Sequence, residues 1–299
     1  MFKHDPTRAE LAAAAGGSDL APVQLLAHGF GGLFLTDTLE AYSSGDIARL
    51  HLATQDYGAV LVRSREVPSA RSFESFGDRF VPMMQHLDRE GIPQYPLEGC
   101  SKISVLLHNT ASLKANAGAR LFHHDGWGHS PIDPGLSMLM AAAIPMSGGS
   151  TLIADARAAY DWLSPGLKNL VDHATVVSRM AREHVEAEKA EGRKRADEFE
   201  HPLVCHNPVS GRKSLIISDR TVCIKGWSRQ DSAPLLNHLQ QHAIQAQLCL
   251  RHMWQVGDVL IWDDRWVKHA GASDVLEASE RELWRLVASI NTQTGEFLK

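Results

Sequence analysis

The feature that most constrains the fold is an apolar run from Leu136 to Ile144, which is interrupted only by Ser137. Turn-forming residues bound it on both sides, at 131–135 and at 145–149. An apolar run of this length between turns favours a strand that is buried on both faces over a helix. The run therefore predicts a fully buried strand near the middle of the chain.

Further strands are predicted on both sides of this run, at 32–36, 59–63, 103–107, 151–153 and 283–290. Two hairpins are also predicted, joining 203–206 to 214–217 through a polar turn and 250–256 to 259–263 through Gly257 and Asp258. Late antiparallel hairpins combined with a few helices favour a double-sheet β-barrel. We therefore expect a mixed α+β chain that is mainly β.

Helices are predicted where apolar residues recur at helical spacing or where a capping residue precedes them. The expected helices are 47–57, ended by Gly58; one capped by Ser69 and running through Phe80; one capped by Asp155; 165–171; and 233–248. The first twenty residues are rich in Ala and Gly, and we expect them to form a loosely packed arm.

The chain has 299 residues, which suits one large domain or two small ones. It contains no internal repeat and no recognisable linker, so we expect a single domain over 1–299. Residues 180–200 form the one strongly charged stretch. It is interpreted as a solvated helix or excursion with internal ion pairs, and the functional alternative is a mobile lid over a site.

The formal net charge is −5, with both signs interspersed, which argues against a nucleic-acid partner. This net charge is compatible with a local basic pocket that binds a small anionic substrate. Four cysteines without a C-x-x-C pair fit reduced thiols in the cytoplasm. The N-terminus lacks the apolar run of a signal peptide, and no stretch approaches the roughly 20 apolar residues of a membrane span. We expect no membrane partner, and the sequence leaves open a homo-oligomer.

The strongest functional motif is a His-X-Asp triplet at His123 and Asp125. On a strand, residues i and i+2 point to the same face, so this imidazole and this carboxylate can converge. His269 is the candidate third ligand. Two imidazoles and one carboxylate on one face of a metal ion leave three positions open, as in non-haem Fe(II) oxygenases, whereas zinc hydrolases usually keep one.

Two arginines follow the third candidate ligand. Arg281 comes twelve residues after His269, where the next antiparallel strand can return to the same pocket. Arg285 lies four residues further, on the same strand face. Because a guanidinium group matches a carboxylate, the pair predicts two anionic groups near the metal, one on a co-substrate and one on the substrate.

Together these fragments resemble the taurine/2,4-dichlorophenoxyacetate dioxygenase family. The resemblance rests on the order and spacing of His123-X-Asp125, the segment 147–151 (SGGST), the segment 257–265 (GDVLIWDDR) with a nearby His, and Arg281-X-X-X-Arg285. It runs from the strand before Arg63 nearly to the C-terminus. It implies Fe(II), 2-oxoglutarate and O2, and a double-stranded β-helix (a cupin-like jelly roll) buttressed by helices.

The resemblance also implies roles for individual residues. His123, Asp125 and His269 would bind iron, and Thr151 and Arg281 would bind the distal carboxylate of 2-oxoglutarate. Arg285 would contact an acidic group of the substrate. The resemblance also allows a contact between Arg285 and 2-oxoglutarate. The implied reaction oxidises, foremost by hydroxylation, an unactivated C–H bond of a small carboxylate or sulfonate such as an amino acid, and releases succinate and CO2.

Two alternatives stay open. The same chemistry can be diverted to desaturation, epoxidation or ring closure in specialised metabolism, or the chain is a non-catalytic jelly-roll sensor that binds metal or 2-oxoglutarate. Related halogenases have a small residue at the place of Asp125, so an acidic ligand there argues for hydroxylation or a related oxidation.

Other residues near the motifs have weaker assignments. His124 is expected to face away from the metal, and His108 and Trp127 are candidate substrate contacts. Trp262 and Trp266 are expected to pack in the core. Asp263 and Asp264 are not expected to act in the site, although the family usually has Asp-Asn there. The family's substrate positions before the triplet are not recognisable, so no particular substrate is carried over.

Overall fold

A computed structural model of the chain describes residues 4–27, 29–85, 95–108, 121–126, 135–179, 198–206, 211–272, 274 and 280–290, with only the backbone of Ala27 and His108. The largest element is a seven-stranded sheet in the order β1-β2-β3-β13-β5-β15-β4. Its strands are β1 (Gln24–Ala27), β2 (Phe30–Thr36), β3 (Ala59–Ser64), β13 (Val259–Asp263), β5 (Gly135–Ala143), β15 (Arg281–Ser289) and β4 (Ser104–His108). Strands β2 and β3 are parallel, and the other neighbouring pairs are antiparallel.

The predicted buried strand is confirmed as β5, which lies between β13 and β15. Met138 and Met140 point into one hydrophobic core, whereas Leu139 and Ala141 point into another. Because both faces of β5 are covered, its sequence is apolar at consecutive positions instead of alternating. The other strands predicted from the sequence correspond to β2, β3, β4, β6 and β15.

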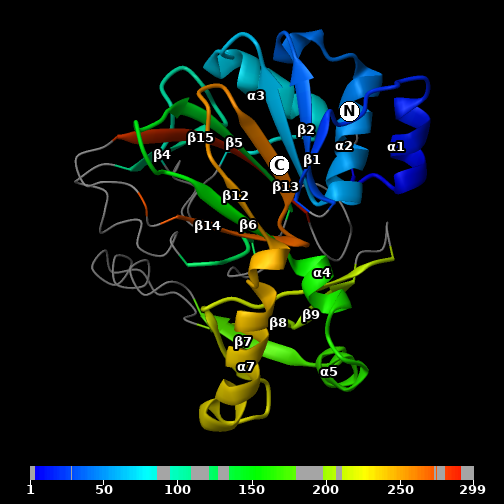
Figure 1. Cartoon of the computed structure of the whole chain (residues 1–299), viewed down its shortest axis with the longest axis vertical. Helices are drawn as coiled ribbons and strands as arrows, with labels where there is room; N and C mark the ends of the chain where they lie inside the picture. The colour runs from blue at the N-terminus through cyan, green and yellow to red at the C-terminus, as the bar shows by residue number, and fades with distance from the viewer. Residues whose placement is uncertain are drawn as a thin grey trace.

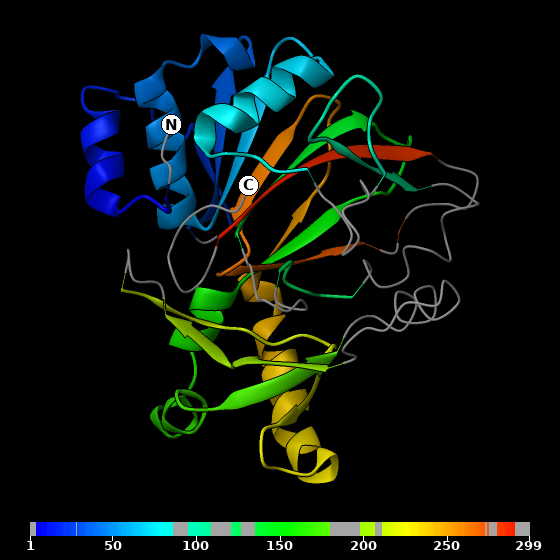
Figure 2. The same ribbon diagram turned by 180° about the vertical axis from the view of Figure 1, so that it is seen from behind.

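Helices cover one face of the large sheet. Helix α2 (Ser44–Tyr57) and helix α3 (Ala70–Phe80) pack their apolar residues against it, as Figures 1 and 2 show. Both predicted ends are confirmed: the side chain of Ser69 caps α3, and α2 stops at Gly58, whose φ of 82° suits glycine. The 3₁₀ turn η1 (Leu39–Ala41) precedes α2.

A smaller sheet covers the other face. It contains β12 (Cys249–His252), β6 (Thr151–Asp155) and β14 (Val267–Gly271) in the order β12-β6-β14. Leu260, Trp262 and Leu283 of the large sheet pack there against Ile153 and Val267. The two facing sheets give the mixed, mainly β jelly-roll core that was predicted, although among the described residues no strand pair closes them into a barrel.

A second body lies between β6 and β12 in the sequence and at the lower end of the molecule in Figure 1. It contains α4 (Ala156–Asp161), α5 (Pro165–Val171), β7 (Thr175–Arg179), β8 (Glu198–Pro202), β9 (Val204–His206), β10 (Lys213–Leu215), β11 (Thr221–Ile224), α7 (Arg229–Ala243) and η3 (Ala246–Leu248). The predicted hairpin of β9 and β10 is confirmed, and helices and strands enclose a separate hydrophobic core. We call this body, residues 156–248, the insert. The single domain over 1–299 stays a prediction.

The second predicted hairpin is wrong. Strand β12 pairs with β6 in the small sheet, whereas β13 pairs with β3 and β5 in the large sheet. All five residues of β13 are buried, so this strand needs cover on both faces and a neighbour at each edge. A hairpin with β12, whose residues are mostly part-exposed, would not provide this environment.

The expected N-terminal arm is wrong in part, because residues 8–15 form helix α1 (Arg8–Ala15). Thr7 and Glu10 form a capping box at its start, and Leu11 is fully buried against α2. Helix α7 was also misplaced: it begins after the cap Ser228 and ends at Ala243, so the expected helix over 233–248 starts too late and runs too far.

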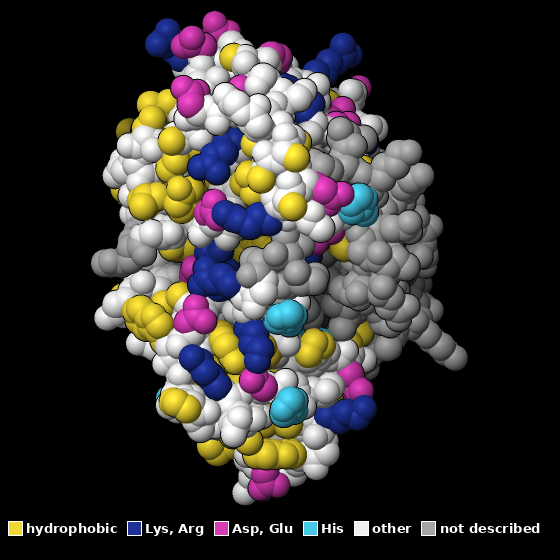
Figure 3. Space-filling view, turned by 90° about the vertical axis from the view of Figure 1, so that its right-hand side faces the viewer, with side chains coloured by type: hydrophobic (Ala, Val, Ile, Leu, Met, Phe, Trp, Pro, Cys, Tyr) yellow, Lys and Arg dark blue, Asp and Glu magenta, His cyan; other side chains and the backbone are white. Residues whose placement is uncertain are grey.

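The charged stretch was expected over 180–200. Residues 180–197 lie outside the described part of the chain, and the last residues of the stretch begin strand β8. No helix in the described residues is long and apolar enough to cross a membrane. On the face in Figure 3, Lys and Arg side chains are interspersed with Asp and Glu side chains. Trp262 and Trp266 are buried, as predicted.

Candidate active site

The two candidate histidines meet across an antiparallel bridge between the segment 121–126 and β14. The backbone N–H of His123 donates to the carbonyl of His269 at 2.9 Å, and the N–H of His269 donates to the carbonyl of His123 at 2.8 Å. Side chains of such a directly opposed pair lie on one face, and the ring centroids are 4.3 Å apart. The fold thus joins two residues that are far apart in the sequence.

Asp125 completes the cluster. One carboxylate oxygen lies 3.7 Å from Nε2 of His123, and the other lies 3.8 Å from Nε2 of His269. One donor atom from each residue can be chosen so that all three lie within 4.8 Å of one another. Two nitrogens and one oxygen at such separations fit the three protein ligands of a non-haem Fe(II) centre.

The rings have the orientation and protonation that a metal ion requires. Nδ1 of His123 lies 2.7 Å from the carbonyl oxygen of Leu121, so it is the protonated nitrogen and Nε2 is left free for a metal. Burial, assisted by the neighbouring His269 imidazole, lowers the pKa of His123 to about 3. Burial also lowers the pKa of His269. Both imidazoles are therefore neutral at pH 7.

The carboxylate of Asp125 is ionised. Burial alone raises its pKa, but the neighbouring His269 imidazole and the Arg285 guanidinium outweigh burial and bring the pKa below its ordinary value. Nη1 of Arg285 lies 3.4 Å from Oδ2 of Asp125. Arg285 therefore contacts the candidate iron ligand directly.

Thr151 and Arg281 also lie together. Nη2 of Arg281 donates to Oγ1 of Thr151 at 3.1 Å, and Nε1 of Trp254 donates to the same oxygen at 3.0 Å. Both lone pairs of the hydroxyl are thus engaged, and its hydrogen remains to be donated to a ligand. Burial lowers the pKa of Arg281 to about 10, and its buried Nε has no hydrogen-bond partner among the described residues. This pair of side chains fits a carboxylate.

Asp264 belongs to the site, which the sequence interpretation missed. Its carboxylate accepts hydrogen bonds from Ser137 Oγ at 2.6 Å and from Trp262 Nε1 at 2.8 Å. The backbone N–H of Asp125 lies 3.4 Å from its Oδ1, and the same Oδ1 lies 3.9 Å from Nδ1 of His269. Asp264 therefore lies beside two candidate ligands, Asp125 and His269. The usual Asn at this place in the family was the signal that could have identified it.

Two weaker candidates cannot be placed. Trp127 lies outside the described residues, and only the backbone of His108 is described, paired with Arg281 between β4 and β15. His124 is buried beside the triad but is not one of its members. Its Nδ1 lies 3.0 Å from the carbonyl oxygen of Asp264.

A comparison with known families fits this arrangement. The profile of the taurine catabolism dioxygenase TauD, TfdA family matches residues 22–287, which include all six residues discussed as ligands of iron, 2-oxoglutarate or substrate. The chain belongs to this family. The TauD, TfdA family assignment agrees with the resemblance found in the sequence.

Curated relatives support the TauD, TfdA assignment. An alpha-ketoglutarate-dependent 2,4-dichlorophenoxyacetate dioxygenase of Cupriavidus pinatubonensis (strain JMP 134 / LMG 1197) is 30% identical over 237 residues, which cover 76% of this chain and 81% of that protein. Pentalenolactone F synthase of Streptomyces arenae is 29% identical over 271 residues, which cover 83% of this chain and 89% of that protein.

Solved structures share the fold. AAD-2 in complex with Mn(II) and N-oxalylglycine matches with a TM-score of 0.71 and 22% identity, over 89% of this chain and 97% of that one. A taurine dioxygenase from Burkholderia xenovorans matches with a TM-score of 0.72 and 20% identity, over 94% and 93%. The chain is accordingly a 2-oxoglutarate-dependent non-haem iron dioxygenase, which uses Fe(II), 2-oxoglutarate and O2. This result favours an enzyme over the sensor alternative.

Proposed function

We propose that His123, Asp125 and His269 bind Fe(II), that Thr151 and Arg281 bind 2-oxoglutarate, and that the enzyme hydroxylates an unactivated C–H bond of a small carboxylate or sulfonate, such as an amino acid. The observation that carries this proposal is the cluster of three neutral or anionic donor groups, together with the part-buried, hydrogen-bonded pair of Arg281 and Thr151. Products would be the oxidised substrate, succinate and CO2.

Each group has a separate task in this proposal. Iron, when bound, supplies the activation of O2 that is coupled to the decarboxylation of 2-oxoglutarate. His123, Asp125 and His269 would hold the iron and would leave it accessible to small molecules. The Arg281 guanidinium and the Thr151 hydroxyl would hold the distal carboxylate, which fixes the register of 2-oxoglutarate at the metal.

Arg285 would contact the acidic group of the substrate. Its position beside Asp125 supports this role, because a group held there lies next to the metal site. Relatives named for a sulfate ester and for 2,4-dichlorophenoxyacetate also support an anionic substrate.

A second reaction deserves a test because one relative is named a pentalenolactone F synthase. The same chemistry can end in desaturation, epoxidation or ring closure, as in specialised metabolism. The mass of the product separates the outcomes: a gain of one oxygen identifies hydroxylation or epoxidation, and a loss of two hydrogens identifies desaturation or cyclisation.

The decisive experiment measures succinate. Anaerobic protein loaded with Fe(II) and 2-oxoglutarate is exposed to O2 with taurine, 2,4-dichlorophenoxyacetate, hexyl sulfate or each proteinogenic amino acid, and succinate and product mass are recorded. We expect at least one acid to raise succinate above the substrate-free rate, and His123→Ala to abolish the rise. If none of these acids raises it, the proposed substrate class is wrong.

The location of the enzyme also belongs to this proposal. All four cysteines are free thiols, which fits the cytoplasm. A homo-oligomer remains a prediction, which sedimentation of the purified protein tests directly.

A further inference from the structure

Arg220 lies in a turn that neighbouring side chains hold in place. The turn connects β10 to β11, and Oγ of Ser218 accepts a hydrogen bond from the N–H of Arg220 at 3.2 Å. The carbonyl of Ser218 accepts from the N–H of Thr221 at 3.0 Å and from Nε2 of Gln240 at 2.7 Å. Oγ of Ser178 donates to Oγ1 of Thr221 at 3.3 Å. A side chain on a turn that is held in place in this way is well positioned to bind a ligand.

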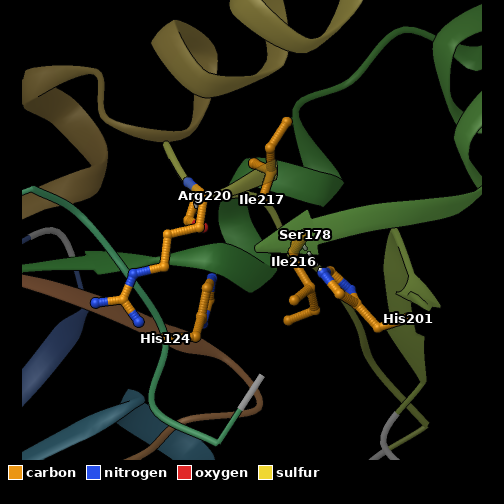
Figure 4. A pocket seen from close by; sticks show the side chains of 7 residues that line it. His124, Ser178, His201, Ile216, Ile217 and Arg220 are labelled. Atoms are coloured by element: carbon orange, nitrogen blue, oxygen red, sulfur yellow. Dashed lines mark hydrogen bonds between the residues drawn. The ribbon is translucent and has the colours of Figure 1, made fainter. Parts of the chain in front are cut away.

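The side chain of Arg220 leaves the turn beside the segment that carries the triad. With His124, Ser178 and His201 it lines a cavity of about 10 Å³, which is room for one water molecule. Figure 4 shows that the guanidinium extends past the His124 ring and points away from Ser178 and His201. The cavity is too small for a substrate.

Arg220 lies close to the candidate metal ligands. It lines the same cavity as His124, which stands between His123 and Asp125 in the sequence. Nη1 of Arg285 lies 3.4 Å from Oδ2 of Asp125. Arg220 and Arg285 therefore approach the segment 123–125 from two parts of the fold, the insert and strand β15.

Arg220 is half-buried. Within the described residues, no carboxylate oxygen lies within 4.0 Å of its guanidinium. Three other buried or half-buried arginines, Arg63, Arg157 and Arg265, each bind a carboxylate. Because desolvation of an unpaired cation costs free energy, a negatively charged ligand is the natural complement of Arg220.

We propose that Arg220 binds the anionic group of the substrate together with Arg285, so that a carboxylate, sulfonate or sulfate of the substrate lies between a guanidinium of the insert and a guanidinium of β15. The inference rests on the proposed function and extends it with a second specificity-determining residue. Two planar guanidinium groups match the several acceptor oxygens of such an anion. Neutral analogues of the same shape would lack both interactions.

Binding to the loaded but inactive protein tests this directly. Protein with Mn(II) and N-oxalylglycine is titrated by calorimetry with 2,4-dichlorophenoxyacetate, (S)-phenoxypropionate, hexyl sulfate, taurine, and the neutral 2,4-dichlorophenoxyethanol. The variants are Arg220→Ala, Arg220→Lys and Arg285→Ala. The matched control is Arg229→Ala, which removes an exposed arginine of the insert that pairs with Glu198.

We expect Arg220→Ala to weaken binding of the preferred anion about 10- to 100-fold, because the loss of a hydrogen bond to a charged group raises Kd by about this factor. Binding of Mn(II) and N-oxalylglycine and of the neutral alcohol stays unchanged, and Arg220→Lys restores part of the loss. In turnover, KM for the anion rises more than kcat falls. Arg229→Ala behaves like the wild type.

Each contrary outcome has its own meaning. If an anion binds the wild type and Arg220→Ala retains the same Kd, Arg220 has no role in recognition, whereas the proposed function stands. If no anion of the panel binds, the anionic substrate class fails and this inference with it. If Mn(II) and N-oxalylglycine do not bind the wild type, the proposed iron and 2-oxoglutarate site itself is wrong.

Discussion

Nη2 of Arg281 donates a hydrogen bond to Oγ1 of Thr151 at 3.1 Å, although 130 positions separate the two residues in the sequence. The contact joins the long strand β15 of the large sheet to the first residue of β6 in the small sheet. The carboxylate site that we propose for 2-oxoglutarate therefore spans both sheets, and each sheet supplies one of its two groups.

Arg281→Gln should raise KM for 2-oxoglutarate about 10- to 100-fold, because a charge-assisted interaction with the distal carboxylate is lost. Thr151→Val should have a smaller effect on KM, and Thr151→Ser, which keeps the hydroxyl, a smaller one still. Steady-state succinate formation at varied 2-oxoglutarate measures these values. Arg65→Gln, at an exposed ion pair with Asp37, is the control. An unchanged KM in Arg281→Gln would remove the role proposed for this arginine.

Asp264 should support the metal site through its hydrogen bonds. In Asp264→Ala, the buried donors of Ser137 and Trp262 lose their acceptor, and we expect a loss of about 3 kcal/mol in the free energy of unfolding. Asp264→Asn keeps one acceptor oxygen, so about 1 kcal/mol is expected. Urea unfolding measures both variants. Mn(II) affinity should fall in the same order, because Asp264 also lies beside Asp125 and His269. Equal stability of Asp264→Ala and wild type would contradict this.

Local patterns in the sequence were sufficient for several strands and for two members of the candidate triad. Strand β5 was predictable because burial on both faces leaves a continuous apolar run, and His123 and Asp125 were predictable because the period of a strand puts them on one face. His269 was named as the candidate third ligand from the sequence, although no local pattern joins it to His123.

Features that depend on distant contacts were missed. Because β12 and β13 follow each other in the sequence, a hairpin was predicted. In the structure β12 pairs with β6 in the small sheet, whereas β13 pairs with β5 in the large sheet. The contribution of Asp264 was missed because its partner Ser137 lies 127 positions away.

Helix α1 was missed for a different reason, because its capping box, Thr7 and Glu10, is a local signal that the sequence interpretation did not use.

The ion pair of Arg63 and Asp258 should link stability to acid pH. Arg63 donates to both carboxylate oxygens of Asp258, at 2.7 and 2.8 Å, where β3 lies beside the start of β13. Burial alone raises the pKa of Asp258, but the hydrogen bond from Arg63 leads the contributions that bring it below its ordinary value. The stabilisation is therefore complete above the unfolded-state pKa of about 4 and is lost as pH falls through the lower folded-state pKa.

Asp258→Asn should lower the free energy of unfolding by about 3 kcal/mol at pH 7, because one partner of a largely buried pair is removed. Between pH 7 and pH 4 the difference should persist, and below pH 4 it should shrink. Urea unfolding at a series of pH values measures it, with Asp37→Asn at the exposed pair with Arg65 as the control. A difference that is the same at pH 7 and at pH 2.5 would show that the charge of Asp258 is not its cause.

Metal binding should stabilise the fold and should depend on His123 but not on its neighbour. At a Mn(II) concentration about 100 times Kd, binding adds about 2.7 kcal/mol, which for a chain of this size raises Tm by about 5 °C. His123→Ala should abolish this rise, because one of three ligands is lost. His124→Ala should retain it, because the His124 ring is bonded to the carbonyl of Asp264 and is not part of the triad. Thermal scans of chelator-treated protein with and without Mn(II) measure the shift. A His124→Ala protein that folds but no longer responds to Mn(II), while His123→Ala still does, would reverse the assignment of the two histidines.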